Sequence, residues 1–370
     1  KRQVLLVGYS TNITISDCFI NTSDNYGGPN TDGLVLIEVD SLFVLRNSIV
    51  SDHGDFAGIR QNHVSSGSLV EIDSNYIKGF DEAGMYIRSG GNNNKVRYNQ
   101  LDTLGQLGIN IQGDSGVFTD NVINSIVGGN GISINGNGGA NVSRNKILGV
   151  TAGSGIVVDA PNSLVANNYV QSDGVGLAKG ISLESNGSGS DVLFNSVNVT
   201  GTDVVNGQGI TVNGGTNYRV KNNIFANNGG GYAAYINSDI STFDWDFNNY
   251  YSTKNSLAFY LGTSYDTLSS LVAASGKDSN SLSVNPLYTS NTDLSINHTL
   301  LNNVATPLSI VVDDIDGTSR LATPDIGAKE YTPCAIDAGI NEIVGIACLL
   351  YTSDAADEGL GVDLGGRRII

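Results

Sequence analysis

Charged and polar side chains that could do acid–base chemistry are concentrated in one stretch near the start of the chain. It contains Asp55, Arg60 and two of the three histidines, His53 and His63. Asp55 lies three residues before a glycine that begins a short apolar pattern, and Asp81 stands in the same relation to the next such glycine. If the two patterns form neighbouring strands, we expect the two carboxylates to be neighbours.

Two stacked carboxylates perturb each other's pKa or share a cation such as Ca²⁺. The same offset places Arg60 beside Tyr86 and Asn62 beside Arg88. An Arg and a Tyr could neutralise a uronate carboxylate and move a proton, as a polysaccharide lyase requires, and paired carboxylates could hydrolyse a glycoside. The candidate catalytic residues are Asp55, Asp81 and His53.

These residues also fit a structural interpretation, in which they form surface salt bridges and Gln61 is an amide satisfied near the start of the fold. The cluster has no Lys, which weakens a lyase assignment, and no catalytic motif of a known family maps onto it. A second acidic group, Asp314-Ile-Asp-Gly317, resembles part of a calcium loop but lacks its later ligands. An Asp-Gly turn is the better interpretation there, so we expect no cofactor, with Ca²⁺ as the one alternative.

The elements that position these side chains are repeats. The phrase Gly131-Ile-Ser-Ile-Asn135 has variants that begin at Gly33, Gly58, Gly84, Gly108, Gly155, Gly180 and Gly209. A second phrase, Asn145-Lys-Ile147, has variants that begin at Asn47, Asn75, Asn99, Asn121, Asn168, Asn195 and Asn223. Both phrases recur about every 25 residues, which is the mark of a repeat protein.

Each first phrase alternates apolar and polar residues, which indicates a short strand with one buried face. The inward pairs are Leu34/Leu36, Met85/Ile87, Ile109/Ile111, Ile132/Ile134, Ile156/Val158, Ile181/Leu183 and Ile210/Val212. A unit of this length has no room for a crossover helix. We therefore expect an all-β solenoid of parallel strands, with about nine turns spaced about 4.8 Å apart.

The recurring Asn and Gly residues fit the bends of such a solenoid. Asn side chains stacked from turn to turn can hydrogen-bond one another, and Gly suits a bend that needs positive φ or close packing. With these phrases the region resembles the right-handed parallel β-helix family, the pectin-lyase-like solenoids. That resemblance covers roughly two thirds of the chain and implies the right-handed coil; it implies no particular activity.

The outward positions of the first strands form a polar row along the predicted solenoid. Hydroxyls, amides and an aromatic ring at about 4.8 Å intervals suit a polysaccharide lying across the turns. A merely solvated face is the alternative. The candidate substrate-binding residues are Arg60, Asn62, His63, Tyr86, Arg88, Asn110 and Gln112.

Composition narrows the class of partner. The formal net charge is −17, with only 15% charged residues and 47 Gly, which argues against nucleic acid and anionic membranes. No apolar run is long enough to span a membrane. Cys18, Cys334 and Cys348 have neither disulfide-framework nor zinc spacing. The chain opens in a strand-like pattern without a leader, so we expect its signal peptide and true N-terminus to lie outside this fragment.

The pattern predicts four segments. Residues 1–242 are β-helix repeats, and 243–331 are a final turn and a C-terminal cap containing one short helix, with Ser264 as its N-cap and Gly276 as its terminator. The cap ends in Pro324-Asp-Ile-Gly-Ala-Lys-Glu-Tyr331, which resembles the caps of β-helix domains in large secreted and surface proteins of bacteria. Residues 332–347 look like the start of a further domain. Residues 348–370 can be back-translated into codons that resemble adapter DNA of transposon-based sequencing libraries, so we expect them to be an artefact.

Three functions fit this sequence. The first is a non-catalytic, extracellular or cell-surface module for adhesion or glycan binding, monomeric within a larger bacterial protein. The second is a polysaccharide lyase or glycoside hydrolase acting on an acidic polysaccharide. The third is a structural spacer, which applies if the polar row binds nothing.

Overall fold

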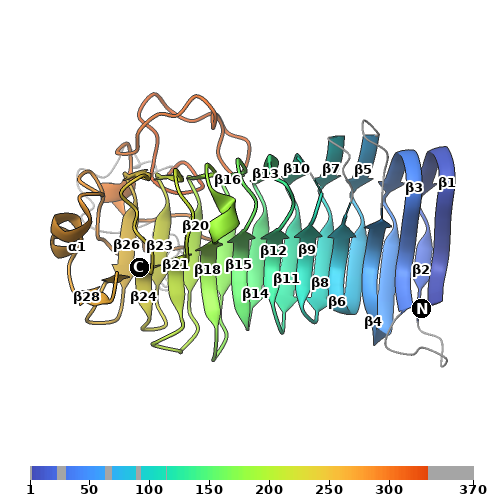
Figure 1. The fold of residues 1–370 in the computed structure, drawn as a ribbon, viewed down its shortest axis with the longest axis horizontal. Coiled ribbons are helices and arrows are strands. Elements are labelled where there is room, and N and C mark those ends of the chain that lie inside the picture. The colour runs from blue at the N-terminus through green and yellow to red at the C-terminus, as the bar shows by residue number, and fades with distance from the viewer. Residues whose placement is uncertain (1, 23–30, 63–68, 89–92, 114, 332–370) are drawn as a thin grey trace, which may run out of the picture. The chain divides into compact units, whose positions relative to one another are not determined.

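The computed structural model describes residues 2–22, 31–62, 69–88, 93–113 and 115–331. Residues up to Glu330 form one compact unit, a solenoid of parallel strands (Figure 1). Each short strand pairs with the strand one turn further along the chain, so three strand columns, faces 1 to 3, run the length of the solenoid. This confirms the predicted β-helix of about nine turns.

Face 1 carries the first repeated phrase and consists of β9 (Leu107–Ile111), β12 (Asn130–Ile134), β15 (Gly153–Val158), β18 (Ala178–Leu183), β21 (Gln208–Val212), β24 (Tyr232–Ile236) and β27 (Ala258–Tyr260). Face 2 consists of β5 (Leu69–Asp73), β7 (Asn93–Arg97), β10 (Gly116–Thr119), β13 (Ala140–Ser143), β16 (Leu164–Ala166), β19 (Asp191–Leu193), β22 (Arg219–Lys221) and β25 (Asp244–Asp246).

Face 3 consists of β2 (Phe19–Asn21), β8 (Gln100–Leu104), β11 (Val122–Ile126), β14 (Lys146–Val150), β17 (Tyr169–Ser172), β20 (Ser196–Val199), β23 (Ile224–Asn227) and β26 (Asn249–Ser252). In the first turns, long strands bend from one face to the next without a break; these are β1 (Arg2–Ser16), β3 (Thr31–Leu45), β4 (Ser48–Asn62) and β6 (Tyr76–Ile87). Two 3₁₀ turns, Ser185–Gly187 and Thr299–Leu301, lie in connections.

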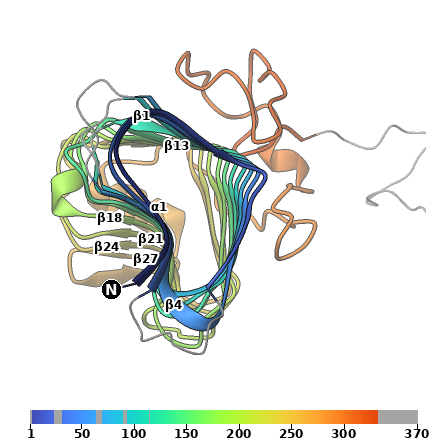
Figure 2. The ribbon, with the colours of Figure 1, turned by 90° about the vertical axis from the view of Figure 1, so that its right-hand side faces the viewer.

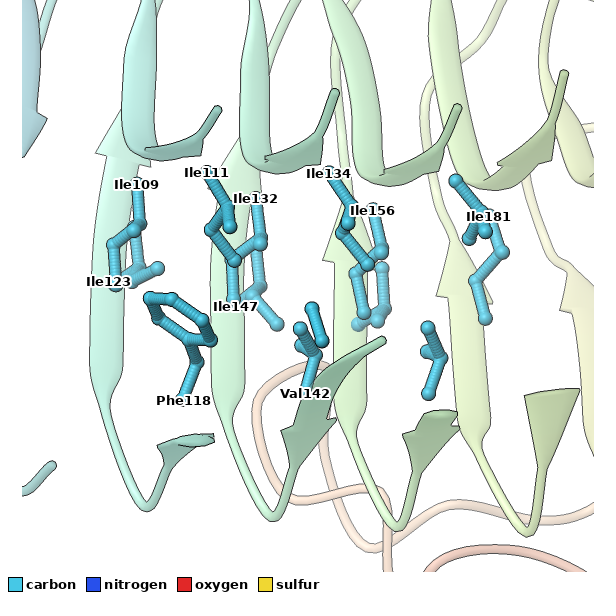
Figure 3. Close-up of a cluster of buried hydrophobic side chains, with 14 of the residues drawn as sticks. Ile109, Ile111, Phe118, Ile123, Ile132, Ile134, Val142, Ile147, Ile156 and Ile181 are labelled. Atoms are coloured by element: carbon cyan, nitrogen blue, oxygen red, sulfur yellow. The ribbon is translucent and has the colours of Figure 1, made fainter. Parts of the chain in front are cut away.

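The core is a set of aliphatic stacks inside the coil. Ile109, Ile132, Ile156 and Ile181 follow one another from turn to turn on face 1 (Figure 3). All the predicted inward pairs are at most 1% exposed, which confirms their assignment. Burial of this apolar surface is the main stabilising term, at roughly 25 cal/mol per Å².

The glycine that opens each first phrase is required by close packing and not by positive φ. A Cβ added to Gly131 would lie 2.6 Å from the carbonyl oxygen of Gly155 and would also collide with the Ile147 side chain. Its backbone is in the ordinary region. Two reasons for glycine at a bend were predicted, positive φ and close packing. At this position close packing against the next turn is the reason.

The predicted Asn ladder runs along the bend between faces 2 and 3. Asn145 illustrates the unit: its Oδ1 accepts from the backbone N–H and the Nδ2 of Asn121, at 3.0 and 2.9 Å. Its own Nδ2 donates to the carbonyl of Phe118 and to Oδ1 of Asn168, at 2.9 and 3.0 Å. A residue with positive φ precedes each ladder position, which turns the chain so that the amide points inward.

The ladder ends at residues that are not asparagine. At its start the backbone N–H of Cys18 donates to Oδ1 of Asn47. At its end the N–H of Asn248 donates to the Ser281 hydroxyl at 2.8 Å, and the N–H of Leu282 donates to the carbonyl of Asn248. Ser281 therefore occupies the place of the next ladder Asn and begins a turn that is not completed.

A short helix covers the C-terminal end of the coil. β28 (Thr263–Tyr265) folds back antiparallel on β27, and α1 (Leu268–Ser275) follows, with Leu271 buried in the core. The N-cap is Thr267, three residues later than predicted, because β28 occupies Ser264. Gly276 ends the helix in the left-handed region, as predicted.

Residues 282–331 lie along the side of the coil (Figure 2). Arg320 fastens this segment, the strap, through hydrogen bonds to Glu330 at 2.6 Å and to Oδ1 of Asn167 at 2.7 Å. Its guanidinium also lies 3.8 Å from the centre of the Phe194 ring. Asn167 and Phe194 both directly precede ladder residues, so the strap lies over the ladder bend.

Candidate functional site

The outward side chains of face 1 form a column in strict register. Asn110, Ser133, Val157, Ser182 and Thr211 follow one another on successive turns, and we call these five residues the outer strip. The column continues in both directions into larger side chains, through Tyr86 and Arg60 on one side and Tyr235 and Phe259 on the other.

The outer strip is much less exposed than predicted. Asn110 is 6% exposed, Ser133 3%, Ser182 2% and Thr211 1%. Their side chains are short and lie one strand spacing apart, and longer side chains of the same strands flank them. The Ser133 hydroxyl accepts from Asn130, and those of Ser182 and Thr211 donate to Glu184 and Gln208, both at 2.6 Å. The alternative of a merely solvated face does not describe these four positions.

The exposed polar groups lie two residues further along each strand end. Gln112, Asn135 and Asn213 are exposed. Asn135 donates to Oδ1 of Asn110 at 3.2 Å, and Asn213 donates to both carboxylate oxygens of Glu184, at 3.0 and 3.1 Å. This edge offers amide donors and acceptors to an incoming hydroxyl-rich ligand.

Arg60 and Tyr86 lie side by side on adjacent turns, as predicted, but Arg60 is not a free cation. It is 3% exposed and forms a two-pronged ion pair with Asp32, at 3.0 and 2.6 Å. Phe56 and Tyr86 also contact it, with ring centres 4.3 and 5.3 Å from the guanidinium carbon. Its charge is therefore neutralised inside the protein.

Tyr86 is held by its neighbours. Its hydroxyl donates to Glu82 at 2.7 Å, and burial followed by this hydrogen bond raises the pKa of the Tyr86 phenol above its usual value. The guanidinium of the exposed Arg88, which directly follows β6, lies 4.8 Å from the ring centre. A phenol in this state keeps its proton at neutral pH and suits contact better than proton abstraction.

The predicted catalytic carboxylates lie on adjacent turns in different surroundings. Asp55 is 2% exposed and accepts a 2.8 Å hydrogen bond from Ser51. A register shift pairs Asp55 with Phe80, so the exposed Asp81 instead lies against Gly54. The structure describes no contact between the two carboxylates.

The remaining predicted residues are less informative. The side chain of His53 and the whole of His63 lie outside the described residues. Asn62 is half-buried at the end of β4. It directly follows Gln61, whose partner on the next turn is Ile87. Catalytic roles for Asp55, Asp81 and His53 therefore stay predictions.

An aromatic cluster that the sequence reasoning missed bounds the other end of the outer strip. Tyr235 and Phe259 stack with ring centres 4.5 Å apart and planes at 5°. Tyr232 packs against both, and the Lys254 ammonium lies 3.6 Å from its ring centre. Extending the first phrase by one turn, which aligns Tyr235 with Thr211, would have found one of them.

Lys179 is a second residue that the sequence reasoning missed. It is half-buried beside the outer strip, between Ser154 and Gln208 on the adjoining turns. Burial lowers the pKa of its ammonium, while the nearby Glu184 acts in the opposite direction. The two residues make no ion pair, because Glu184 is hydrogen-bonded to Ser182 and Asn213.

The calcium-like loop is a turn. Oδ1 of Asp314 accepts from the backbone N–H groups of Asp316 and Thr318, both at 2.9 Å, and Gly317 has positive φ. Within the described residues no group of three or more His, Cys, Asp or Glu side chains is placed to hold a metal ion. Among the described residues, no helix is long and apolar enough to cross a membrane.

A cavity of about 460 Å³ lies within the strap. Its walls come from Pro307, Leu308, Ser309, Val311, Val312, Arg320, Leu321 and Pro324. They are mainly aliphatic, and their one charged group, Arg320, is already paired with Glu330. We therefore place the candidate site on face 1.

Residues 94–247 match the family model of the right-handed β-helix region. The repeat region of this chain is a right-handed parallel β-helix. The matched residues include every turn of the outer strip. No curated protein matches this chain in sequence.

Proposed function

We propose that this β-helix is a non-catalytic module that binds a glycan along face 1. The observation that carries the proposal is the outer strip, five small side chains in unbroken register with exposed amides beside them. Hydroxyl-rich ligands bind through such neutral donors and acceptors, and a rigid strand scaffold positions them accurately. The resemblance of the strap's end to caps of bacterial surface proteins supports an extracellular location.

Blocking the strip tests this function. Ser182→Tyr places a large ring in the strip, and the fold should accept it because Tyr86 and Tyr235 occupy the same column. We expect the wild-type chain to retain glycans on an array and Ser182→Tyr to abolish retention. The matched control, Ser283→Tyr, is on the exposed strap and should bind normally.

Two outcomes would contradict the proposal. Equal loss in Ser182→Tyr and Ser283→Tyr would mean that binding is not on face 1, and a wild-type chain that retains no glycan would favour the spacer. Catalysis is checked by incubation with uronate polymers, followed by the absorbance of unsaturated ends and by reducing-sugar release. We expect no turnover.

A further inference from the structure

The outer strip has two ends. Its five residues belong to five successive strands, β9, β12, β15, β18 and β21. The four spacings between them span roughly 19 Å at about 4.8 Å per turn. Beyond them the same column carries Tyr86 on one side and Tyr235 on the other. Small residues are therefore enclosed between large ones.

The C-terminal end presents a flat ring. Tyr235 and Phe259 stack almost parallel although they belong to adjacent turns, so their planes lie across the long axis of the coil. Phe259 covers one face of Tyr235. The other face is directed towards the turn of Thr211, whose side chain is much shorter. An aromatic face of this kind can stack against the C–H face of a sugar ring.

The N-terminal end is closed by a different arrangement. Tyr86 is 4% exposed, and the guanidinium groups of Arg60 and Arg88 lie near its ring, at 5.3 and 4.8 Å. A ligand that lies along the strip meets Arg88 and Tyr86 after five turns.

Charges of both signs lie near the strip. Lys179 lies near Glu184, Arg60 is neutralised by Asp32, and Arg88 is exposed at the N-terminal end. The chain as a whole carries −17, so its field repels a polyanion.

We propose that the outer strip takes a linear, uncharged glycan of limited length, whose terminal sugar stacks on Tyr235. This rests on the proposed function and adds the ligand's charge and its length. Because one sugar of an extended chain advances by about the distance between turns, the strip accommodates about five sugars.

Calorimetric titration of the full chain with two oligosaccharide series tests the inference. The probes are cello-oligosaccharides and oligogalacturonides, each from dimer to octamer. We expect the neutral series to bind more tightly with each added sugar up to about the pentamer and then no further. The variant Tyr235→Leu keeps an apolar side chain but removes the flat face, and should weaken pentamer binding about tenfold, or about 1.4 kcal/mol. The control Tyr251→Leu, on face 3, should change nothing.

The outcomes separate this inference from the function beneath it. In one outcome, Ser182→Tyr abolishes binding, but the affinity of the wild type keeps rising to the octamer or is higher for the galacturonides. That outcome overturns the inference and leaves the proposed glycan binding intact. Equal affinity of Tyr235→Leu and the wild type also overturns it. Binding of neither series to the wild-type chain overturns both proposals.

Discussion

Asp278 is a buried carboxyl without a cation. Tyr250 donates a hydrogen bond to it at about 3.0 Å, Ser281 donates one at 2.5 Å, and Trp245 donates to the Tyr250 hydroxyl at 2.5 Å. Burial raises the pKa of Asp278 to about 7. Below about pH 7 the neutral acid therefore holds the end of the ladder, since Ser281 is the residue that terminates it.

This residue should make stability depend on pH. An unfolded aspartate has a pKa near 3.9, so the unfolded chain binds fewer protons than the folded chain between about pH 4 and pH 7. The free energy of unfolding should therefore fall as pH rises through that window and level off above it, by up to about 4 kcal/mol. Asp278→Asn mimics the neutral acid. The urea midpoint of this variant should therefore depend less on pH than the midpoint of the wild type.

The exposed Asp266 provides the control, because Asp266→Asn should leave the profile unchanged. Parallel urea-midpoint profiles for the wild type and Asp278→Asn would show that Asp278 is ionised in the folded chain at neutral pH.

Among the elements, the ladder makes each bend depend on its neighbours. Asn145→Ala would remove the acceptor for two donors of Asn121 and the donor to Phe118. Because each buried group left without a partner costs about 1–3 kcal/mol, we expect a loss on the order of 3 kcal/mol in chemical denaturation. Asn124→Ala removes a half-exposed amide from β11, which pairs with the strand that follows Asn145, and should cost within about 0.5 kcal/mol. Similar losses at the two sites would refute the ladder's energetic role.

The strands and the ladder could be predicted from the sequence because both are local patterns repeated at a fixed spacing. The burial of Ser133 could not be predicted from the sequence, because it depends on how far the flanking side chains extend from the strand. The Asp32–Arg60 pair was missed for a related reason: it joins different outward columns on neighbouring turns. Periodicity identifies which residues share a column, but it does not give contacts between columns.

At the scale of the whole molecule, the path of the strap was also beyond prediction, because irregular chain carries no period. Arg320→Met would leave Glu330 and Asn167 without their shared donor in a buried setting, where breaking one partner of an ion pair costs about 3–5 kcal/mol. We expect faster amide hydrogen exchange within residues 282–331 and unchanged protection in β9 and β12. Lys329→Met breaks a half-exposed pair with Asp316 and should have little effect.

Unchanged exchange in the strap of Arg320→Met would mean that its other contacts suffice. Two of these are the backbone N–H and carbonyl of Thr306, both bonded to the Asn222 side chain.

The ladder also makes the number of turns adjustable. Asn121 and Asn145 are equivalent residues 24 positions apart, and each contacts only the turns beside it. Removing residues 121–144 would make Asn99 and Asn145 neighbours in the ladder, with an equivalent bend at Asn145. Both ends of the ladder would stay unchanged. The same deletion removes Ser133, so the outer strip loses one position. Under the proposed glycan-binding function, gain or loss of one repeat in the gene would change the length of glycan that fits. Evolution could then adjust that length without redesigning a contact.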